Sequence, residues 1–375
     1  MSRIRIFALH NAGYLRGEGS EHAVPSDFRV CWFPAFRYPE AVMKNTWIIP
    51  LLLLSATAAD AQLPFANKGP FTAKDSLDIG KEKSLDARDC LIDLAWDPKS
   101  FQVTLEEVPG APDAVLRFPS PKPNGNAKND KVAVEWYMAR EPKGQKKNNA
   151  LPVVVVHELG SNMAAGRAVA AGLSRIGFHA FMVQLPSYGD RRVRRRARPA
   201  EMLQPMQQAI ADVRRARDAV LVMPTVDTSH IALQGTSLGG IIAATAGGLD
   251  KGFNSVHLVL AGGDLFTLIK TGQRDTAYVR RDLERAGVTD DELRKMTQRI
   301  EPTRVAHRLP REGTWLYSGK ADTVIPMANA KALAKSAGLT EGYHQTFNAN
   351  HYTGMVFLPW VVSDIAANIT KMTKR

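Results

Sequence analysis

Residues 229–249 read SHIALQGTSLGGIIAATAGGL. The stretch starts with a short apolar segment, passes through GTSLG at 235–239, and ends in small residues that suit a closely packed helix. A strand, a sharp turn and a helix in this order strain the backbone of the central residue, so the positions two before and two after it cannot carry large side chains. Glycine fits both positions. The stretch predicts that Ser237 is displayed on a turn between a strand and a helix.

A second apolar stretch lies upstream, at residues 151–156, and is followed by HELG at 157–160. An almost unbroken aliphatic run is typical of a strand buried on both faces of a parallel sheet. In acyl-transfer enzymes with such a turn, the loop after this strand donates one backbone N–H to the oxyanion, and the residue after the nucleophile donates the other. The two donors would be Leu159, or alternatively Glu158, and Leu238.

A base and an acid should follow the serine in the order Ser, Asp or Glu, His. Residues 314–318 form a predicted strand that leads into Asp322, and residues 345–348 form the next strand, just before His351. Ligands of open α/β sheets bind outside the carboxyl ends of the strands. We therefore expect Ser237, Asp322 and His351 to meet at that edge of the sheet.

Other residues compete for the roles of acid and base. Asp264 follows the predicted strand at 256–260 and is an alternative acid, although the turn and proline around Asp322 suit an acid loop better. Among the histidines, His344 opens its strand, His257 is inside a strand, and His307 precedes one. These positions favour His351 as the base.

With these motifs, residues 101–371 resemble the α/β-hydrolase superfamily, and within it the esterases and dienelactone-hydrolase-like enzymes. The resemblance implies an α/β fold with a mostly parallel central sheet, antiparallel lead-in strands and helices on both faces. One departure is Glu158, where many relatives carry glycine. A carboxylate near the oxyanion would be unfavourable unless it points away or is paired.

The rest of the chain divides into recognisable parts. Strands are expected at 101–108, 114–118 and 131–138, and helices at 163–176 and 201–223. Residues 265–313 form a charged insertion with a capping box from Thr289 to Glu292, which is either a small helical cap over the site or a surface excursion. Residues 62–100 are polar and irregular, with one short helix expected at 86–95 and no role assigned. The hydrolase domain is expected at 101–375.

The N-terminal region resembles a bacterial secretory signal that begins inside the chain. At residues 43–61, a lysine precedes an apolar run, and an Ala-Asp-Ala cleavage site ends before Gln62. The run is much shorter than the about 18 residues of a membrane span, so no stable span is expected. Residues 1–42 would then be an over-extended translation start or a genuine N-terminal extension. We expect the mature protein to be exported to the periplasm or the extracellular space.

The chain is basic, with a formal net charge of +12 in 375 residues. Six arginines lie among residues 191–198, in a loop that is either a solvated surface or the rim of the pocket, where it would attract anionic substrates. His157, Tyr188 and Arg191 are candidate substrate contacts. No aromatic interleaving accompanies the charge, so no nucleic-acid role is expected. No metal-ligand spacing occurs in the sequence.

Together, these patterns predict a secreted serine hydrolase that cleaves carboxylic esters without a cofactor. The expected substrate is a small-molecule or polysaccharide-linked ester, and an anionic ester is one candidate. A peptidase of the same fold and a non-catalytic binding protein remain the alternatives, because fold does not determine substrate.

Overall fold

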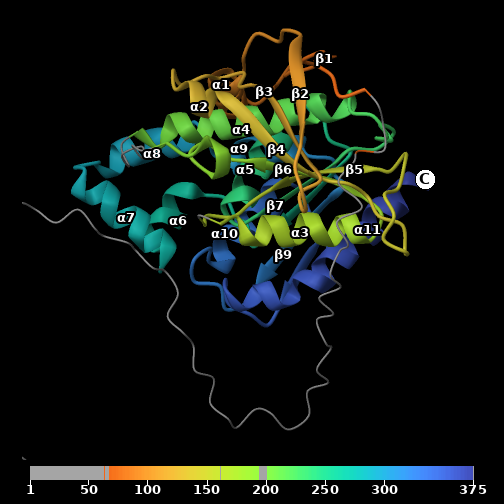
Figure 1. The fold of residues 1–375 in the computed structure, drawn as a ribbon. Coiled ribbons are helices and arrows are strands. Elements are labelled where there is room, and N and C mark those ends of the chain that lie inside the picture. The colour runs from red at the N-terminus through yellow and green to blue at the C-terminus, as the bar shows by residue number, and fades with distance from the viewer. Residues whose placement is uncertain (1–62, 64–66, 161, 194–200, 375) are drawn as a thin grey trace, which may run out of the picture. The chain divides into compact units, whose positions relative to one another are not determined.

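A ten-stranded sheet lies at the centre of the part of the chain that the structure describes (Figure 1). The structure is a computed structural model, and it describes residue 63 and residues 67–160, 162–193 and 201–374. The predicted segments 1–42 and 43–61, and the arginines between 194 and 198, lie outside the described residues. The first three strands that the sequence predicts are confirmed, with shifts of one residue at their ends.

The order of the strands across the sheet is β1-β2-β3-β4-β6-β5-β7-β8-β9-β10. From β1 to β6 the neighbours are antiparallel, and from β6 to β10 they are parallel. The strands are β1 (Phe71–Ala73), β2 (Phe101–Glu107), β3 (Ala114–Pro119), β4 (Lys131–Tyr137), β5 (Pro152–Val156), β6 (His179–Gln184), β7 (Ala232–Thr236), β8 (Ser255–Val259), β9 (Thr314–Gly319) and β10 (His344–Phe347). This is the mostly parallel sheet with antiparallel lead-in strands that the sequence predicts.

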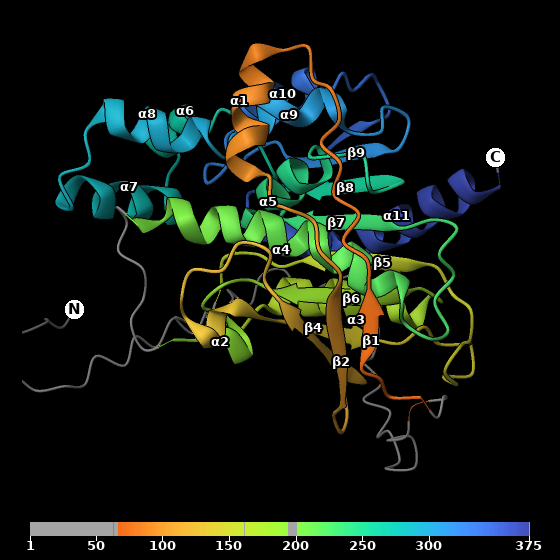
Figure 2. The same ribbon diagram turned by 90° about the horizontal axis from the view of Figure 1, so that it is seen from above.

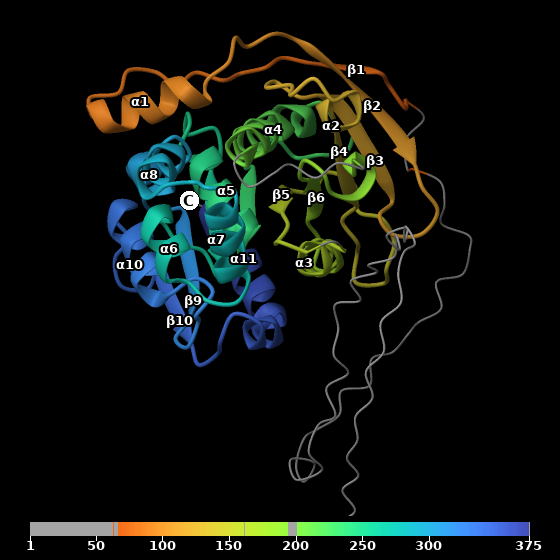
Figure 3. The same ribbon diagram turned by 90° about the vertical axis from the view of Figure 1, so that its left-hand side faces the viewer.

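Helices cover both faces of the sheet, as Figure 3 shows. One face packs against α4, α5 and α10, and the other against α3 and α11. The helices are α1 (Leu85–Leu94), α2 (Ala127–Asp130), α3 (Ala164–Arg175), α4 (Leu203–Leu221), α5 (Leu238–Gly247), α6 (Leu265–Thr271), α7 (Asp275–Arg285), α8 (Asp290–Gln298), α9 (Pro302–Val305), α10 (Met327–Ser336) and α11 (Leu358–Thr373), with 3₁₀ turns η3 (Gly189–Arg191), η5 (Ala306–Arg308) and η6 (Thr353–Phe357).

The central strands are buried because aliphatic residues point to both faces. All five residues of β5 are buried, as the aliphatic run predicts.

Helix α5 can approach β7 closely because it begins with small residues. A Cβ atom on Gly239 would lie 2.2 Å from the carbonyl oxygen of Val156, and one on Gly240 would lie 2.6 Å from the Cβ of Ala261. The small residues thus hold α5 directly against the sheet.

The segment Thr353–Thr373, which contains η6 and α11, is long and apolar enough to cross a membrane by length and composition. Its apolar residues Val361, Val362, Ile365 and Ile369 are buried in the same cluster as α3 and the sheet. The pairing of α11 with α3 explains why this helix is apolar.

The predicted insertion at 265–313 consists of the helices α6, α7 and α8, followed by α9 and η5. In Figure 2, α6, α7 and α8 lie together at one end of the molecule, opposite the carboxyl terminus. The capping box is present at the start of α8, where the Thr289 side chain accepts a hydrogen bond from the N–H of Glu292 and the Glu292 side chain accepts one from the N–H of Thr289. This pairing satisfies two N–H groups of the first turn.

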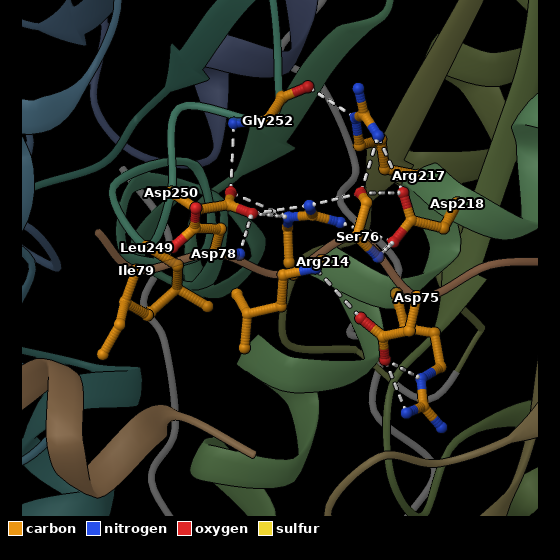
Figure 4. A network of polar contacts seen from close by, with 12 residues as sticks. Asp75, Ser76, Asp78, Ile79, Arg214, Arg217, Asp218, Leu249, Asp250 and Gly252 are labelled. Carbon is orange, nitrogen blue, oxygen red and sulfur yellow. Dashed lines mark hydrogen bonds and ion pairs between the residues drawn. The ribbon is translucent and has the colours of Figure 1, made fainter. Parts of the chain in front are cut away.

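Residues 67–100 contain β1 and α1, and both elements contact α4. The short helix expected at 86–95 corresponds to α1, whose N-cap is Ser84. A network of charged residues fixes this segment to α4 (Figure 4). The N–H and hydroxyl of Ser76 donate to Asp218 at 2.8 and 2.7 Å, and Asp75 accepts two hydrogen bonds from Arg215.

Arg214 is the centre of this network, and its side chain is almost fully buried. Its guanidinium contacts Asp218 at 3.0 Å and Asp250 at 2.5 Å. Burial opposes ionisation of Asp218, yet the charge of Arg214 and the hydrogen bonds from Ser76 lower the pKa of Asp218 overall. Arg217 also contacts Asp218, at 2.7 Å, but Arg214 is the cation that bridges Asp218 and Asp250.

We expect Arg214→Met to lower the free energy of unfolding by about 3–5 kcal/mol, because it leaves the buried carboxylate of Asp250 without its cation and removes one of the two cations that contact Asp218. Urea denaturation of the purified variant measures the change. The control is Lys99→Met, which removes the same charge from an ion pair with Asp97 whose side chains are more than 70% exposed. Equal midpoints for the two variants would show that the network contributes little.

Candidate active site

Ser237 lies on the turn between β7 and α5, as the sequence predicts. Its backbone has φ 55° and ψ −120°, a combination that is strained for a residue with a side chain. A Cβ atom on Gly235 would lie 2.2 Å from the carbonyl oxygen of Gly239, so the turn cannot accept a larger residue there. The N–H of Ser237 donates to the carbonyl oxygen of Val259 on the neighbouring strand β8, which anchors the turn.

Asp322 and His351 meet Ser237 at the carboxyl edge of the sheet, after β9 and β10. The Oγ of Ser237 lies 2.9 Å from the Nε2 of His351, and the Nδ1 of His351 lies 2.7 Å from an Oδ2 oxygen of Asp322. The other oxygen of Asp322 accepts hydrogen bonds at 2.9 Å from the N–H groups of Val324 and Ile325. These two N–H groups fix the plane of the carboxylate.

The contact with Asp322 also defines which nitrogen of His351 carries the proton. A carboxylate only accepts hydrogen bonds, so Nδ1 donates and Nε2 is left to accept the hydroxyl proton of Ser237. This tautomer is the one that a general base needs in order to activate a serine.

The alternative acid, Asp264, has a different position. It is the N-cap of α6, with φ 54°, and its side chain accepts a hydrogen bond at 3.3 Å from the N–H of Thr267. The structure thus brings Asp322, and not Asp264, into contact with His351.

Each competing histidine either contacts a side chain other than Ser237 and Asp322 or has no hydrogen-bond partner among the described residues. His344 contacts the hydroxyl of Ser318 at 3.0 Å, and His307 contacts Glu82 at 3.2 Å. His257 is fully buried and stacks on Trp315, with ring centroids 4.9 Å apart, and neither of its nitrogens has a hydrogen-bond partner among the described residues. Burial lowers the pKa of His257 to about 3. His257 is therefore a neutral core residue.

The loop after β5 is held by its own side chains. His157 is fully buried, its Nε2 accepts from the N–H of Leu185 at 3.1 Å, and its Nδ1 therefore donates to the carbonyl oxygen of Glu158 at 2.7 Å. Burial lowers the pKa of His157, which keeps the ring neutral. The prediction that His157 contacts substrate is wrong, because both of its nitrogens bind backbone groups.

Glu158, the departure from the usual glycine, pairs with the N-terminus of α3. Its two carboxylate oxygens accept hydrogen bonds at 3.0 Å from the N–H groups of Ala165 and Gly166, in the first turn of α3. A carboxylate is favourable at a helix N-terminus because it pairs with free N–H groups. Glu158 therefore orders the loop that carries Leu159, one of the two predicted oxyanion donors. The other, Leu238, is the first residue of α5.

Arg191 takes neither of the two positions expected for the arginine loop, a solvated surface or the rim of the pocket. Its side chain is fully buried, contacts Asp212 at 2.7 Å, and donates to the carbonyl oxygens of Asn129 and Gln184. Tyr188 packs edge-on against His157, with ring centroids 4.7 Å apart. Arg191 and Tyr188 thus stabilise the loop after β6.

An apolar cavity of about 130 Å³ lies beside Ser237. Helices α4, α6, α7 and α8 contribute to its walls, so the insertion at 265–313 does form part of this cavity. The lining residues are Leu159, Met202, Leu203, Met206, Ser237, Leu238, Ile241, Leu265, Leu268, Ile269, Asp275, Thr276, Val279, Leu293, Met296, Thr297, Ile300, Val324 and Ile325. Both predicted oxyanion donors are among them.

No protein-family model matches the sequence, and no curated protein is detectably similar to it. Among solved structures, an acetyl xylan esterase from Paenibacillus sp. R4 has a TM-score of 0.52 at 15% identity, over 75% of this chain and 95% of that one. Acetyl xylan esterase 1 from Thermoanaerobacterium sp. JW/SL YS485 has a TM-score of 0.49 at 12% identity, over 74% and 92%. The order of the strands and the first of these similarities together establish that this chain has the α/β-hydrolase fold.

Proposed function

We propose that this protein is an exported serine hydrolase that cleaves carboxylic esters through an acyl-enzyme. The observation that carries the proposal is the pair of contacts from Ser237 to His351, at 2.9 Å, and from His351 to Asp322, at 2.7 Å. A nucleophile, a base and an orienting acid in hydrogen-bond contact are the arrangement that acyl transfer requires. We expect no cofactor.

In the proposed mechanism, the Oγ of Ser237 attacks the ester carbonyl while Nε2 of His351 takes the hydroxyl proton. Asp322 stabilises the imidazolium that forms. The N–H groups of Leu159 and Leu238 hold the negative oxygen of the tetrahedral intermediate. The histidine then gives its proton to the leaving alcohol, and a water molecule repeats the sequence to release the acid.

The cavity beside Ser237 supports an ester with a small apolar acyl group, because its volume is modest and its walls are largely aliphatic. Acetylated carbohydrates are a second substrate class to test, since an acetyl xylan esterase shares the fold. We propose export on the predicted signal at residues 43–61.

Three measurements on protein purified from its native source test these proposals: labelling with a fluorophosphonate probe, assays with p-nitrophenyl esters, and determination of the N-terminal residue. We expect stoichiometric labelling of Ser237, hydrolysis of short p-nitrophenyl esters, and an N-terminus at Gln62. Labelling with cleavage of aminoacyl amides but not of esters would favour a peptidase. Absence of labelling in folded protein would favour a binding protein, and an intact peptide from residues 1–42 would contradict processing.

A further inference from the structure

The walls of the cavity beside Ser237 contain few polar side chains. Apart from Ser237, the polar lining residues are Asp275, Thr276 and Thr297. The hydroxyls of the two threonines donate to main-chain carbonyl oxygens, at 2.8 Å for Thr276 and 2.9 Å for Thr297. Their hydrogen-bond donors are therefore already used. Asp275 is the one charged residue among the described residues that line this cavity.

Asp275 is the first residue of α7, and its neighbours hold it in place. The hydroxyl of Tyr352, the residue after His351, lies near the Asp275 carboxylate. Burial and the charge of Asp275 raise the pKa of Tyr352 to about 12. Arg274 is the N-cap of α7 and has a φ of 53°. Its guanidinium lies 5.5 Å from the centroid of the Tyr352 ring. Tyr352 thus connects the loop of His351 to the insertion.

The position of the carboxylate also suits its charge. It lies in the first turn of α7, where the partial positive charge of the helix N-terminus favours an anion. Asp275 is half-buried, and the other described walls of the cavity are largely apolar, which weakens the screening of its charge inside the cavity. Among the described residues that line this cavity, none is basic.

We propose that Asp275 is a specificity-determining residue, which makes the cavity select neutral or cationic acyl groups over anionic ones. This inference rests on the proposed ester hydrolysis. This preference for neutral or cationic groups is the reverse of the attraction for anionic substrates that the sequence of arginines at 191–198 suggests. A negative group on the acyl chain would approach a fixed carboxylate in an apolar cavity, whereas a quaternary ammonium would be stabilised by it.

Three p-nitrophenyl esters of similar shape test the inference: 4-(trimethylammonio)butanoate, neutral 5,5-dimethylhexanoate and 4-sulfobutanoate. We expect kcat/KM of the wild-type protein to be higher for the cationic ester than for the anionic one. In Asp275→Asn, the ratio of cationic to anionic kcat/KM should fall about tenfold, because one unit of charge is lost. Added salt should reduce the same ratio in the wild-type protein.

Two further variants separate charge from structure. Glu284→Gln removes a charge from an exposed position on the same helix, and it should leave the ratio unchanged. Tyr352→Phe removes the hydroxyl beside Asp275 but keeps the Asp275 carboxylate, so the variant should retain most of the discrimination between the cationic and anionic esters. If Asp275→Asn does not fold, the salt dependence of the wild-type ratio gives the answer.

A ratio that stays the same in folded Asp275→Asn, or that does not respond to salt, would overturn the inference. So would a Tyr352→Phe variant that loses discrimination as completely as Asp275→Asn, because the effect would then come from the position of the loop. Failure of the proposed function has a different signature, since none of the three esters would be hydrolysed by the wild-type protein.

Discussion

Ser237→Ala is expected to lower ester turnover by several powers of ten, because the variant has no oxygen that can attack the carbonyl. His351→Ala should cost a similar factor, since the hydroxyl then has no base at 2.9 Å to take its proton. The two side chains act as a unit, so the double variant should be little slower than either single one. Stopped assays with a p-nitrophenyl ester at saturating concentration measure these losses.

Thermal unfolding of the same variants provides the control. Alanine keeps the Cβ atom and therefore the backbone strain at position 237, and it loses only the hydroxyl, so the variant should fold about as stably as the wild-type protein. A folded Ser237→Ala protein with full esterase activity would contradict the mechanism itself.

The second large effect is expected for Asp322→Asn, with a loss of roughly 10⁴-fold in kcat by analogy with other serine triads. One oxygen of Asp322 accepts two backbone N–H groups, from Val324 and Ile325. The amide oxygen of asparagine would keep that position and direct its NH₂ group toward Nδ1 of His351. That NH₂ group would donate to Nδ1, so the imidazole proton would move to Nε2. A protonated Nε2 cannot accept the proton of Ser237.

Asp264→Asn is the matched comparison, because it makes the same chemical change at the alternative acid. Asparagine caps a helix about as well as aspartate, so α6 should keep its N-cap. We expect turnover near the wild-type value. If Asp264→Asn abolished turnover and Asp322→Asn did not, the acid would be wrongly assigned although the fold would stand.

Local patterns in the sequence were enough to predict the strands and helices that carry the site. The aliphatic run of β5 indicated a buried strand, and the glycines at 235 and 239 indicated a sharp turn that larger side chains would block. Since parallel strands end at one edge of the sheet, the order of Ser237, Asp322 and His351 along the chain also predicted that they meet. The structure brings the three side chains together, and their catalytic roles remain predictions.

Contacts between distant segments could not be inferred in this way. Arg191 lies in a run of arginines that is typical of a solvated loop, yet Asp212 and two carbonyl oxygens compensate its charge in the interior. The sequence around Asp275 does not show that Tyr352 lies beside it, because folding brings these two distant residues together. Periodicity and turn chemistry act over a few residues, so the sequence by itself determined the fold and the meeting of the three site residues. The burial of charges and the lining of the cavity depend on which segments pack together, so only the tertiary structure decided them.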